Sequence, residues 1–178
     1  YDKIVGAMTP KNMTPYIIEE RQLNISQLDV FSRLMMDRII FLGEGINDYV
    51  ANIVTAQLLF LESTDRTKDI QMYINSPGGV VTSGMVIYDT IKMIQSPVST
   101  ICMGLAASMG SILLSVGTKG KRFVFPHGEV MIHQPSIGGY FQATSADIEI
   151  HAEQIRKTKE LGAKILAENC GKTVEQVM

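Results

Sequence analysis

Strand-like and helix-like segments alternate along the middle of this 178-residue chain. Residues 70–75 have apolar side chains at every second position, which predicts a strand that ends at residues 76–79, and residues 81–94 have the spacing of a helix. The same order repeats at residues 98–103, an apolar strand-like run, and at residues 111–116, which are helix-like. Strands that alternate with helices predict an α/β domain.

Further elements are predicted on both sides of this region. Residues 38–42 are expected to form a short buried strand, followed by a turn in which Asn47 caps a helix. Thr144 and Asp147 have the spacing of a capping box, which predicts a long helix that ends near Asn169. The apolar faces of these two helices are expected to comprise Val50, Ile53, Val54, Leu58 and Leu61 in the first, and Ile148, Ala152, Ile155, Ile165 and Leu166 in the second.

Composition indicates one globular domain and argues against several classes of partner. Hydrophobic residues make up 46% of the chain and charged residues 19%, as in a folded protein with a sizeable core. The net charge of −2, without a Lys or Arg cluster, argues against a nucleic-acid surface. No window is apolar for long enough to span a bilayer, so no membrane partner is expected. The two cysteines form no disulfide framework, and Cys102 is expected to be a buried thiol.

Ser108 stands in the most informative stretch of the chain, Gly-Leu-Ala-Ala-Ser-Met-Gly-Ser at residues 104–111. It falls between a strand-like and a helix-like run, and its Gly and Ala neighbours leave room for a substrate carbonyl near the hydroxyl. Amides at the start of the following helix can face a developing negative charge. Small residues between a strand and a helix are also a common packing device, so this stretch alone leaves catalysis and packing both open.

A serine nucleophile needs a base within hydrogen-bond reach, because a neutral hydroxyl is a weak nucleophile. The chain has three histidines. His133 follows the strand-like residues 130–132, where site residues often lie, whereas His127 falls in a turn and His151 in the polar part of the long helix. His133 is therefore the best candidate for the base that takes the serine proton and returns it to the leaving amine.

A tetrahedral intermediate also needs two N–H donors for its oxyanion. The amide of Met109 is one candidate, and Gly78-Gly79 can supply the other, because absent side chains let a backbone N–H approach a substrate. An ordinary turn is the alternative interpretation of Gly78-Gly79. The sequence has no metal-ligand spacing and no P-loop, so no cofactor is expected and no means of using ATP is visible.

Four segments taken together resemble the proteolytic subunits of the Clp protease family (ClpP), which are serine peptidases. The resemblance covers nearly the whole chain from about Thr14 onward. It implies a crotonase-like α/β fold, a stack of strand-strand-helix units with a protruding handle helix at about residues 136–169. The four segments, whose order and spacing match the family without a gap, are residues 73–79 (YINSPGG), 87–90 (IYDT), 104–111 (GLAASMGS) and 131–135 (MIHQP).

The resemblance further implies a serine endopeptidase with a Ser-His-Asp triad. Ser108 would then be the nucleophile and His133 the general base, with the amides of Gly79 and Met109 as the oxyanion-hole donors. Residues 19–178 would form a single peptidase domain, and residues 1–18 an arm that lines an axial pore.

The aspartate of the family's triad follows the segment that corresponds to residues 175–178. The third member is therefore expected from a continuation of the chain past Met178. Asp89 and Asp147 are poor substitutes, because the matching family segments place them on helices away from the site.

The same resemblance implies the partners. Two stacked rings of seven identical subunits enclose a chamber, and a hexameric AAA+ unfoldase (ClpX-, ClpA- or ClpC-like) spends the ATP and feeds unfolded polypeptides into it. A bacterial cytoplasm is the expected location, with an organelle matrix or stroma as the alternative. The resemblance also implies an apolar pocket at the ring edge that docks loops of the unfoldase. Gln71 stands where the family often has an aromatic residue in this pocket. The apolar residues that match the pocket could alternatively belong to the hydrophobic core. The residues that match this pocket are Tyr73, Met93, Ile101, Met103, Phe123 and Phe125.

Two other functions remain as alternatives. A catalytically inactive, structural ring subunit of the same assembly would usually lack the serine or the histidine, and Ser108 and His133 are both present. A crotonase-type acyl-CoA enzyme would use acidic groups and a CoA pocket in place of a Ser-His pair. The sequence therefore favours an active serine endopeptidase that cleaves unfolded polypeptides.

Overall fold

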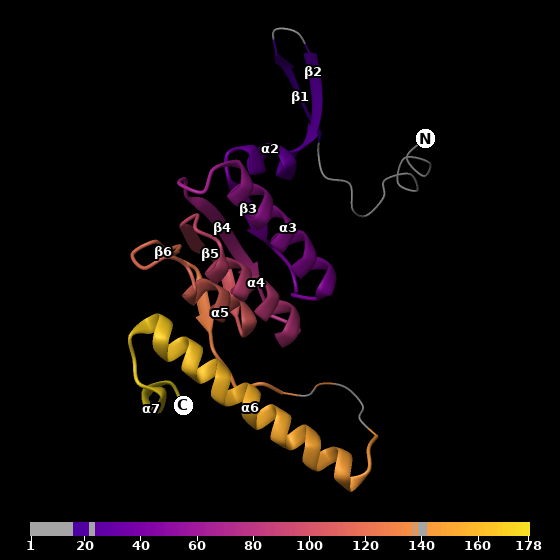
Figure 1. The fold of residues 1–178 in the computed structure, drawn as a ribbon, viewed down its shortest axis with the longest axis vertical. Coiled ribbons are helices and arrows are strands. Elements are labelled where there is room, and N and C mark those ends of the chain that lie inside the picture. Colours follow the sequence, from indigo (N-terminus) through magenta and orange to yellow (C-terminus); the bar gives the residue numbers. More distant parts are fainter. Residues whose placement is uncertain (1–15, 22–23, 137, 139–141) are drawn as a thin grey trace.

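A five-stranded parallel sheet forms the centre of the computed structural model, which describes residues 16–21, 24–136, 138 and 142–178 (Figure 1). Four strands lie in the order β3-β4-β5-β6, and β7 also pairs with β5. Strands β6 and β7 lie end to end along one edge of β5, because they pair with its residues 100–102 and 105–107. The strands are β3 (Ile39–Leu42), β4 (Ile70–Ser76), β5 (Val98–Ala107), β6 (Arg122–Val124) and β7 (Glu129–Met131).

Three helices pack against one face of this sheet: α3 (Asp48–Thr64), α4 (Val81–Met93) and α5 (Met109–Ser115). Ile70, Met72 and Ile74 of β4 point into the core and are fully buried, whereas the residues between them are more exposed, as the alternating pattern predicted. The α/β class and these elements are therefore confirmed.

The predicted apolar face of α3 was wrong at one position. Asn47 caps the helix through a hydrogen bond from the Val50 amide, as expected, and most of the predicted face is buried. Ile53, however, is 40% exposed, and Ala51 takes its place in the core. The apolar face of a helix can be wider than the area that packs against the sheet, so a residue at the margin of that face remains exposed to solvent.

A separate hairpin precedes the sheet. Strand β1 (Tyr16–Arg21) pairs antiparallel with β2 (Asn24–Asp29), and α2 (Val30–Met36) connects the hairpin to β3. The Asp29 carboxylate caps α2 by accepting hydrogen bonds from the Phe31 and Ser32 amides. Most of the expected arm at residues 1–18 lies outside the described residues, and its boundary with the domain falls inside β1.

The long helix α6 (Ser145–Cys170) projects from the body of the molecule, and α7 (Val174–Val177) follows it (Figure 1). Its predicted capping box is present, and Gly171 ends it in the left-handed conformation. Only its C-terminal half is buried, at Ala163, Ile165 and Ala167. The predicted apolar face therefore contacts the body only near its end, and Ile148 is 52% exposed.

Asn169 and Arg122 tie the end of α6 to the body. The Arg122 guanidinium donates to the carbonyl oxygens of Gly117 and Asn169, over 2.6 and 2.5 Å. The Asn169 amide donates to the Ser115 hydroxyl of α5 over 3.0 Å. The base of the projecting helix is thus fixed to the last residue of α5.

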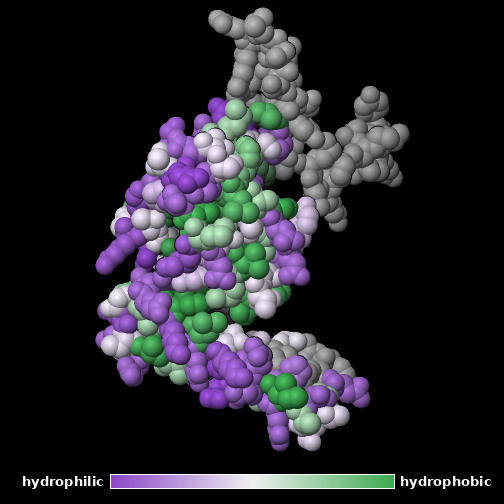
Figure 2. Space-filling model, in the orientation of Figure 1, coloured by the Kyte–Doolittle hydropathy of each residue, from purple (hydrophilic) through white to green (hydrophobic). Residues whose placement is uncertain are grey.

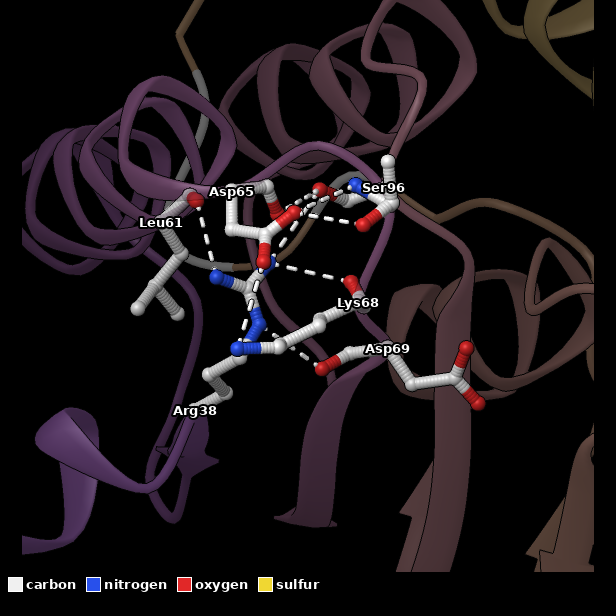
Figure 3. Close-up of polar contacts among 7 residues, drawn as sticks. Arg38, Leu61, Asp65, Lys68, Asp69 and Ser96 are labelled. Carbon is white, nitrogen blue, oxygen red and sulfur yellow. Dashed lines mark hydrogen bonds and ion pairs between the residues drawn. The ribbon is translucent and has the colours of Figure 1, made fainter.

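Arg38 connects three segments at the other edge of the sheet, just before β3 begins (Figure 3). Its guanidinium donates to the carbonyl oxygens of Leu61, Lys68 and Asp69 over 2.9 to 3.0 Å, and to the Ser96 hydroxyl over 3.2 Å. Arg38 has a φ of 64°, which is unfavourable for a residue with a Cβ. The hydrogen bonds that this backbone conformation permits offset the strain.

We expect Arg38→Ala to lower the free energy of unfolding by about 2–4 kcal/mol, because several hydrogen bonds to a charged group are lost together. Arg38→Lys should recover only part of the loss, since an ammonium group cannot reproduce the planar fork. Urea unfolding measures both. Lys121→Ala is the matched control, because its exposed ion pair with Asp69 should contribute less than about 1 kcal/mol. Equal losses in Arg38→Ala and Lys121→Ala would contradict the stabilising role of the Arg38 network.

Candidate active site

Ser108 occupies a sharp turn between β5 and α5. Its φ of 53° and ψ of −121° lie outside the regions that residues with a Cβ favour, so the surrounding structure must hold it there. The Ser108 amide donates to the carbonyl oxygen of Met131 on β7 over 2.8 Å. Its carbonyl oxygen accepts from the amide and hydroxyl of Ser111, over 3.0 and 2.6 Å. Both neighbouring elements thereby fix the turn.

His133 reaches the same place from β7. It comes two residues after Met131, whose carbonyl accepts from the Ser108 amide, and both His133 and Ser108 line one cleft of about 240 Å³. His133 is exposed, and no hydrogen bond joins it to Ser108 in the described part of the chain. Such bonds are often long before substrate binds. The structure therefore brings the two predicted residues to one cleft without closing the contact between them.

The two predicted oxyanion donors, the backbone amides of Gly79 and Met109, have no acceptor among the described residues. Met109 lines the cleft, whereas Gly79 is not among its lining residues and follows Gly78, which contacts the Ser108 turn. Met109 is the first residue of α5, so its N–H has no partner within the helix. Gly79 forms a parallel bridge with Ile46, in which Ile46 donates to Gly78 and Val80 donates to Ile46. The N–H of the bridged residue points away from Ile46 in this pattern. The predicted donors are thus both available.

Gly78 lets the turn at Ser76–Gly79 approach the Ser108 turn closely. Its φ is 86°, and a Cβ there would lie 2.6 Å from the carbonyl oxygen of Ala107 and from the Ser108 Cβ. Residues with a side chain would be excluded by strain and by contact. The sequence predicted that glycines at these positions let a backbone N–H approach a substrate. At Gly78, the lack of a side chain instead allows close contact with the Ser108 turn.

Neither aspartate weighed as a substitute lies in the cleft. Asp89 is exposed on α4, and Asp147 accepts hydrogen bonds from Thr144, which lower the pKa of its carboxyl. No aspartate or glutamate is among the described residues that line the cleft, but Val177 and Met178 are. The end of α7 therefore lies beside Ser108 and His133.

The wall of the cleft is mostly apolar and comes from three helices. Sequence reasoning missed this contribution, although the helical spacing of Leu161 and Ile165 is a signal for it. Lys159 and Thr158 add polar groups at one side. The apolar lining residues of α4, α5 and α6 include Val81, Met85, Ile112, Leu161, Ile165 and Leu166.

The described residues contain no group of three or more His, Cys, Asp or Glu side chains placed to hold a metal ion, and none of their helices is long and apolar enough to cross a membrane. Cys102 and Cys170 are free, and burial raises the pKa of the Cys102 thiol. Cys102 is therefore a core residue, as expected.

Comparison with known proteins identifies the family. Residues 21–178 match the family described as Clp protease. A protein of Porphyromonas gingivalis (strain ATCC BAA-308 / W83), named ATP-dependent Clp protease proteolytic subunit, is 58% identical over 165 residues, 93% of this chain and 73% of that protein. The chain belongs to the Clp protease family.

Two further relatives of the Clp protease family have the same name. One from Bacteroides fragilis (strain ATCC 25285) is 58% identical over 93% of this chain and 79% of its own length. One from Bacteroides thetaiotaomicron is 58% identical over 88% of this chain and 70% of its own length. The expected family, fold class and serine-peptidase function are thereby confirmed.

The residues expected to dock a Clp unfoldase lie mainly on the sheet face opposite the helices. Tyr73, Ile101 and Phe123 are partners in the strand register and form one row across β4, β5 and β6. Met103 follows on β5 and Phe125 directly after β6, where it is exposed. Ile101 is buried, so the row combines core and surface positions.

Met93 does not join this row within one chain. It is 67% exposed at the end of α4, in the helix layer on the other side of the sheet. Sequence reasoning missed Phe31 and Phe41, which extend the row. The Phe41 ring stacks on Tyr73 with centroids 5.4 Å apart, and Phe31 meets Phe41 edge to face at 5.6 Å. Phe41 pairs with Tyr73 in the register of β3 and β4, a relation that local sequence patterns do not specify.

Proposed function

We propose that this Clp protease subunit cleaves peptide bonds with Ser108 as nucleophile and His133 as general base. One observation carries the proposal: Ser108 and His133, from different strand ends, line one cleft together with Met109, whose backbone N–H has no acceptor in the described residues. The apolar walls of the cleft favour substrates with apolar side chains near the cleaved bond.

The arrangement supports a two-stage acyl transfer. As the Ser108 oxygen bonds to the substrate carbonyl carbon, His133 takes the hydroxyl proton, and the amides of Gly79 and Met109 donate to the oxyanion. The C–N bond then breaks, and His133 gives the proton to the leaving amine. Water, deprotonated by His133, hydrolyses the acyl-enzyme by the same route and restores the Ser108 hydroxyl.

An aspartate that orients His133 is part of this proposal. The resemblance assigns it to the segment after residues 175–178. Val177 and Met178 line the same cleft as Ser108 and His133, which supports that assignment. A carboxylate that accepts from the second ring nitrogen would hold His133 in the tautomer that the base needs.

The assembly is proposed as two stacked rings of seven subunits that receive unfolded chains from an AAA+ Clp unfoldase. Exposed apolar side chains support contacts between copies: Figure 2 shows them gathered over the helix layer, and they include Ile53, Phe60, Val86 and Met93. The projecting α6, with exposed Ile148, would be the handle between rings. The exposed position of Met93 suits a contribution to the docking pocket of a neighbouring copy.

The remaining details of the proposal follow the same resemblance. Residues 1–18 would be the axial arm and residues 19–178 the peptidase domain. A bacterial cytoplasm is the proposed location, and the bacterial origin of the named relatives supports it. The relatives' names favour this reading over an acyl-CoA enzyme, and the presence of both Ser108 and His133 in one cleft favours an active over a structural subunit.

A fluorophosphonate probe tests the function directly. The full-length protein should be labelled at Ser108 alone, as mapped by mass spectrometry of tryptic peptides. Labelling should be lost in Ser108→Ala and strongly slowed in His133→Ala, because the probe needs an activated serine oxygen. The proposal would be contradicted if the folded, assembled protein were not labelled, or were labelled at another serine.

A further inference from the structure

We propose that Ser76 is a positioning residue, which holds the Gly79 amide in the oxyanion hole. This inference rests on the proposed function of Ser108, since Ser76 acts only through the backbone of residues 78 and 79. It concerns a side chain that neither the triad nor the oxyanion hole includes.

The Ser76 hydroxyl is enclosed and has a hydrogen bond in each direction. Ser76 is fully buried at the end of β4. Its hydroxyl donates to the carbonyl oxygen of Glu44 over 2.7 Å and accepts from the Gly78 amide over 3.1 Å. A single side chain therefore connects the turn before α3 to the Pro77–Gly78 peptide, which is the neighbour of the peptide that contains the Gly79 N–H.

The Gly78-Gly79 segment has little conformational preference of its own. Its φ values are 86° and 151°, both in regions that side chains rarely adopt. Glycine reaches these conformations readily but also leaves them readily, because no Cβ restricts the peptide. The direction of the Gly79 N–H must therefore be set from outside the segment.

Three hydrogen bonds hold the segment, and Ser76 supplies the one that comes from a side chain. The Gly78 carbonyl shares a peptide plane with the Gly79 N–H, so the bond from Ile46 fixes the direction of that N–H, and Ser76 fixes the peptide before it. Ile46 donates to the Gly78 carbonyl over 2.8 Å, and Val80 donates to the Ile46 carbonyl over 2.9 Å. Both bonds lie on one edge of the segment. The hydroxyl of Ser76 holds the Gly78 N–H itself, which the bonds with Ile46 leave without a partner.

Ser76 also lies directly beneath the Ser108 turn. A Cβ at Gly110 of α5 would be 3.1 Å from the Ser76 carbonyl oxygen, and Ser76 pairs with Ala106 in the β4–β5 register. A shift at Ser76 would thus change the spacing between the Gly79 amide and the Ser108 oxygen. A displacement of about 1 Å in such a site lowers a rate by about 100-fold.

Steady-state hydrolysis of a fluorogenic peptide tests the proposal. We expect Ser76→Ala to lower kcat by about 10- to 100-fold with KM within about threefold of the parent, because the oxyanion donor acts mainly in the transition state. The inhibition constant of a peptide boronate, which forms a tetrahedral adduct at the serine, should rise by a similar factor. The pH profile of kcat/KM should keep its shape, since His133 is untouched.

Ser99→Ala is the matched control. Ser99 is also buried and donates to a backbone carbonyl, that of Lys121, but it lies at the other end of β5. Its variant should lose similar stability and keep the parent kcat. If Ser76→Ala does not fold, kcat and the boronate inhibition constant are measured for Ser76→Cys instead. Its thiol fills the space of the hydroxyl but makes weaker hydrogen bonds.

The outcomes separate this inference from the function on which it rests. Fluorophosphonate labelling of the parent at Ser108, with unchanged kcat and boronate affinity in Ser76→Ala or Ser76→Cys, would overturn the role of Ser76 alone. Absence of labelling in the parent would overturn the proposed function. A loss of kcat in Ser99→Ala equal to that in Ser76→Ala would show that the effect is general destabilisation, and would also overturn the inference.

Discussion

Replacing Ser108 by alanine is expected to lower kcat for a short peptide by about 10⁴-fold or more, because no covalent intermediate can form. His133→Ala should cost a similar factor, and the double variant should be little worse than either single one, since the two residues act as a unit. Initial rates with a fluorogenic peptide measure all three. The side-chain truncation at Ser108 should leave the free energy of unfolding almost unchanged.

Histidines outside the cleft provide the control for this experiment. His127 and His151 do not line the cleft, so His127→Ala and His151→Ala should keep the parent kcat. A Ser108→Ala variant that retains more than about one tenth of the parent rate would contradict its role as nucleophile. An equal loss of activity in His127→Ala and His133→Ala would contradict the role of His133 as the general base.

Replacing Gly78 by alanine is expected to lower both the free energy of unfolding and kcat more than alanine does at a second glycine, Gly120. The added Cβ would meet the Ala107 carbonyl oxygen and the Ser108 Cβ, and the φ of 86° would be strained. We expect a loss of about 3 kcal/mol or more in the free energy of unfolding. At a temperature where the variant is still folded, kcat should fall by about 100-fold or more, because the Ser108 turn and the Gly79 amide are pushed apart.

Gly120→Ala separates strain from contact in this prediction. Gly120 has the same φ of 86°, but a Cβ there would meet nothing within 4 Å. Its variant should lose only about 1–2 kcal/mol, from the left-handed conformation alone, and should keep full activity. Equal effects on kcat in the two glycine variants would show that the close approach of Gly78 to the Ser108 turn has no functional role.

Periodicity predicted the central elements well, because their patterns follow directly from one-sided burial. The β4 alternation and the capped helices α3 and α6 are examples. The hairpin β1–β2 was not predicted: residues 1–18 were expected to form an arm, and no strand was predicted before residue 38. Its strands form a two-stranded sheet of their own, so they lack the pattern that burial against a core produces.

The candidate site was only partly predictable for a different reason. Ser108 and His133 follow strand-like runs, so each could be found locally, and parallel pairing with β5 explains why they meet. Which helices wall the cleft depends on how α6 returns to the body, through contacts such as that of Asn169 with Ser115. The separation of Met93 from the Tyr73 row likewise follows from the two sides of the sheet, which local spacing does not specify.

The groups proposed for catalysis come from the ends of β4, β5 and β7, and β7 is the last strand of the sheet along the chain. A chain that has been synthesised only as far as α5 therefore has a serine but neither its base nor the edge that holds the Ser108 amide. The proposed catalytic pair therefore comes together only when β7 pairs with β5, so a chain that ends before β7 would lack the Ser-His site.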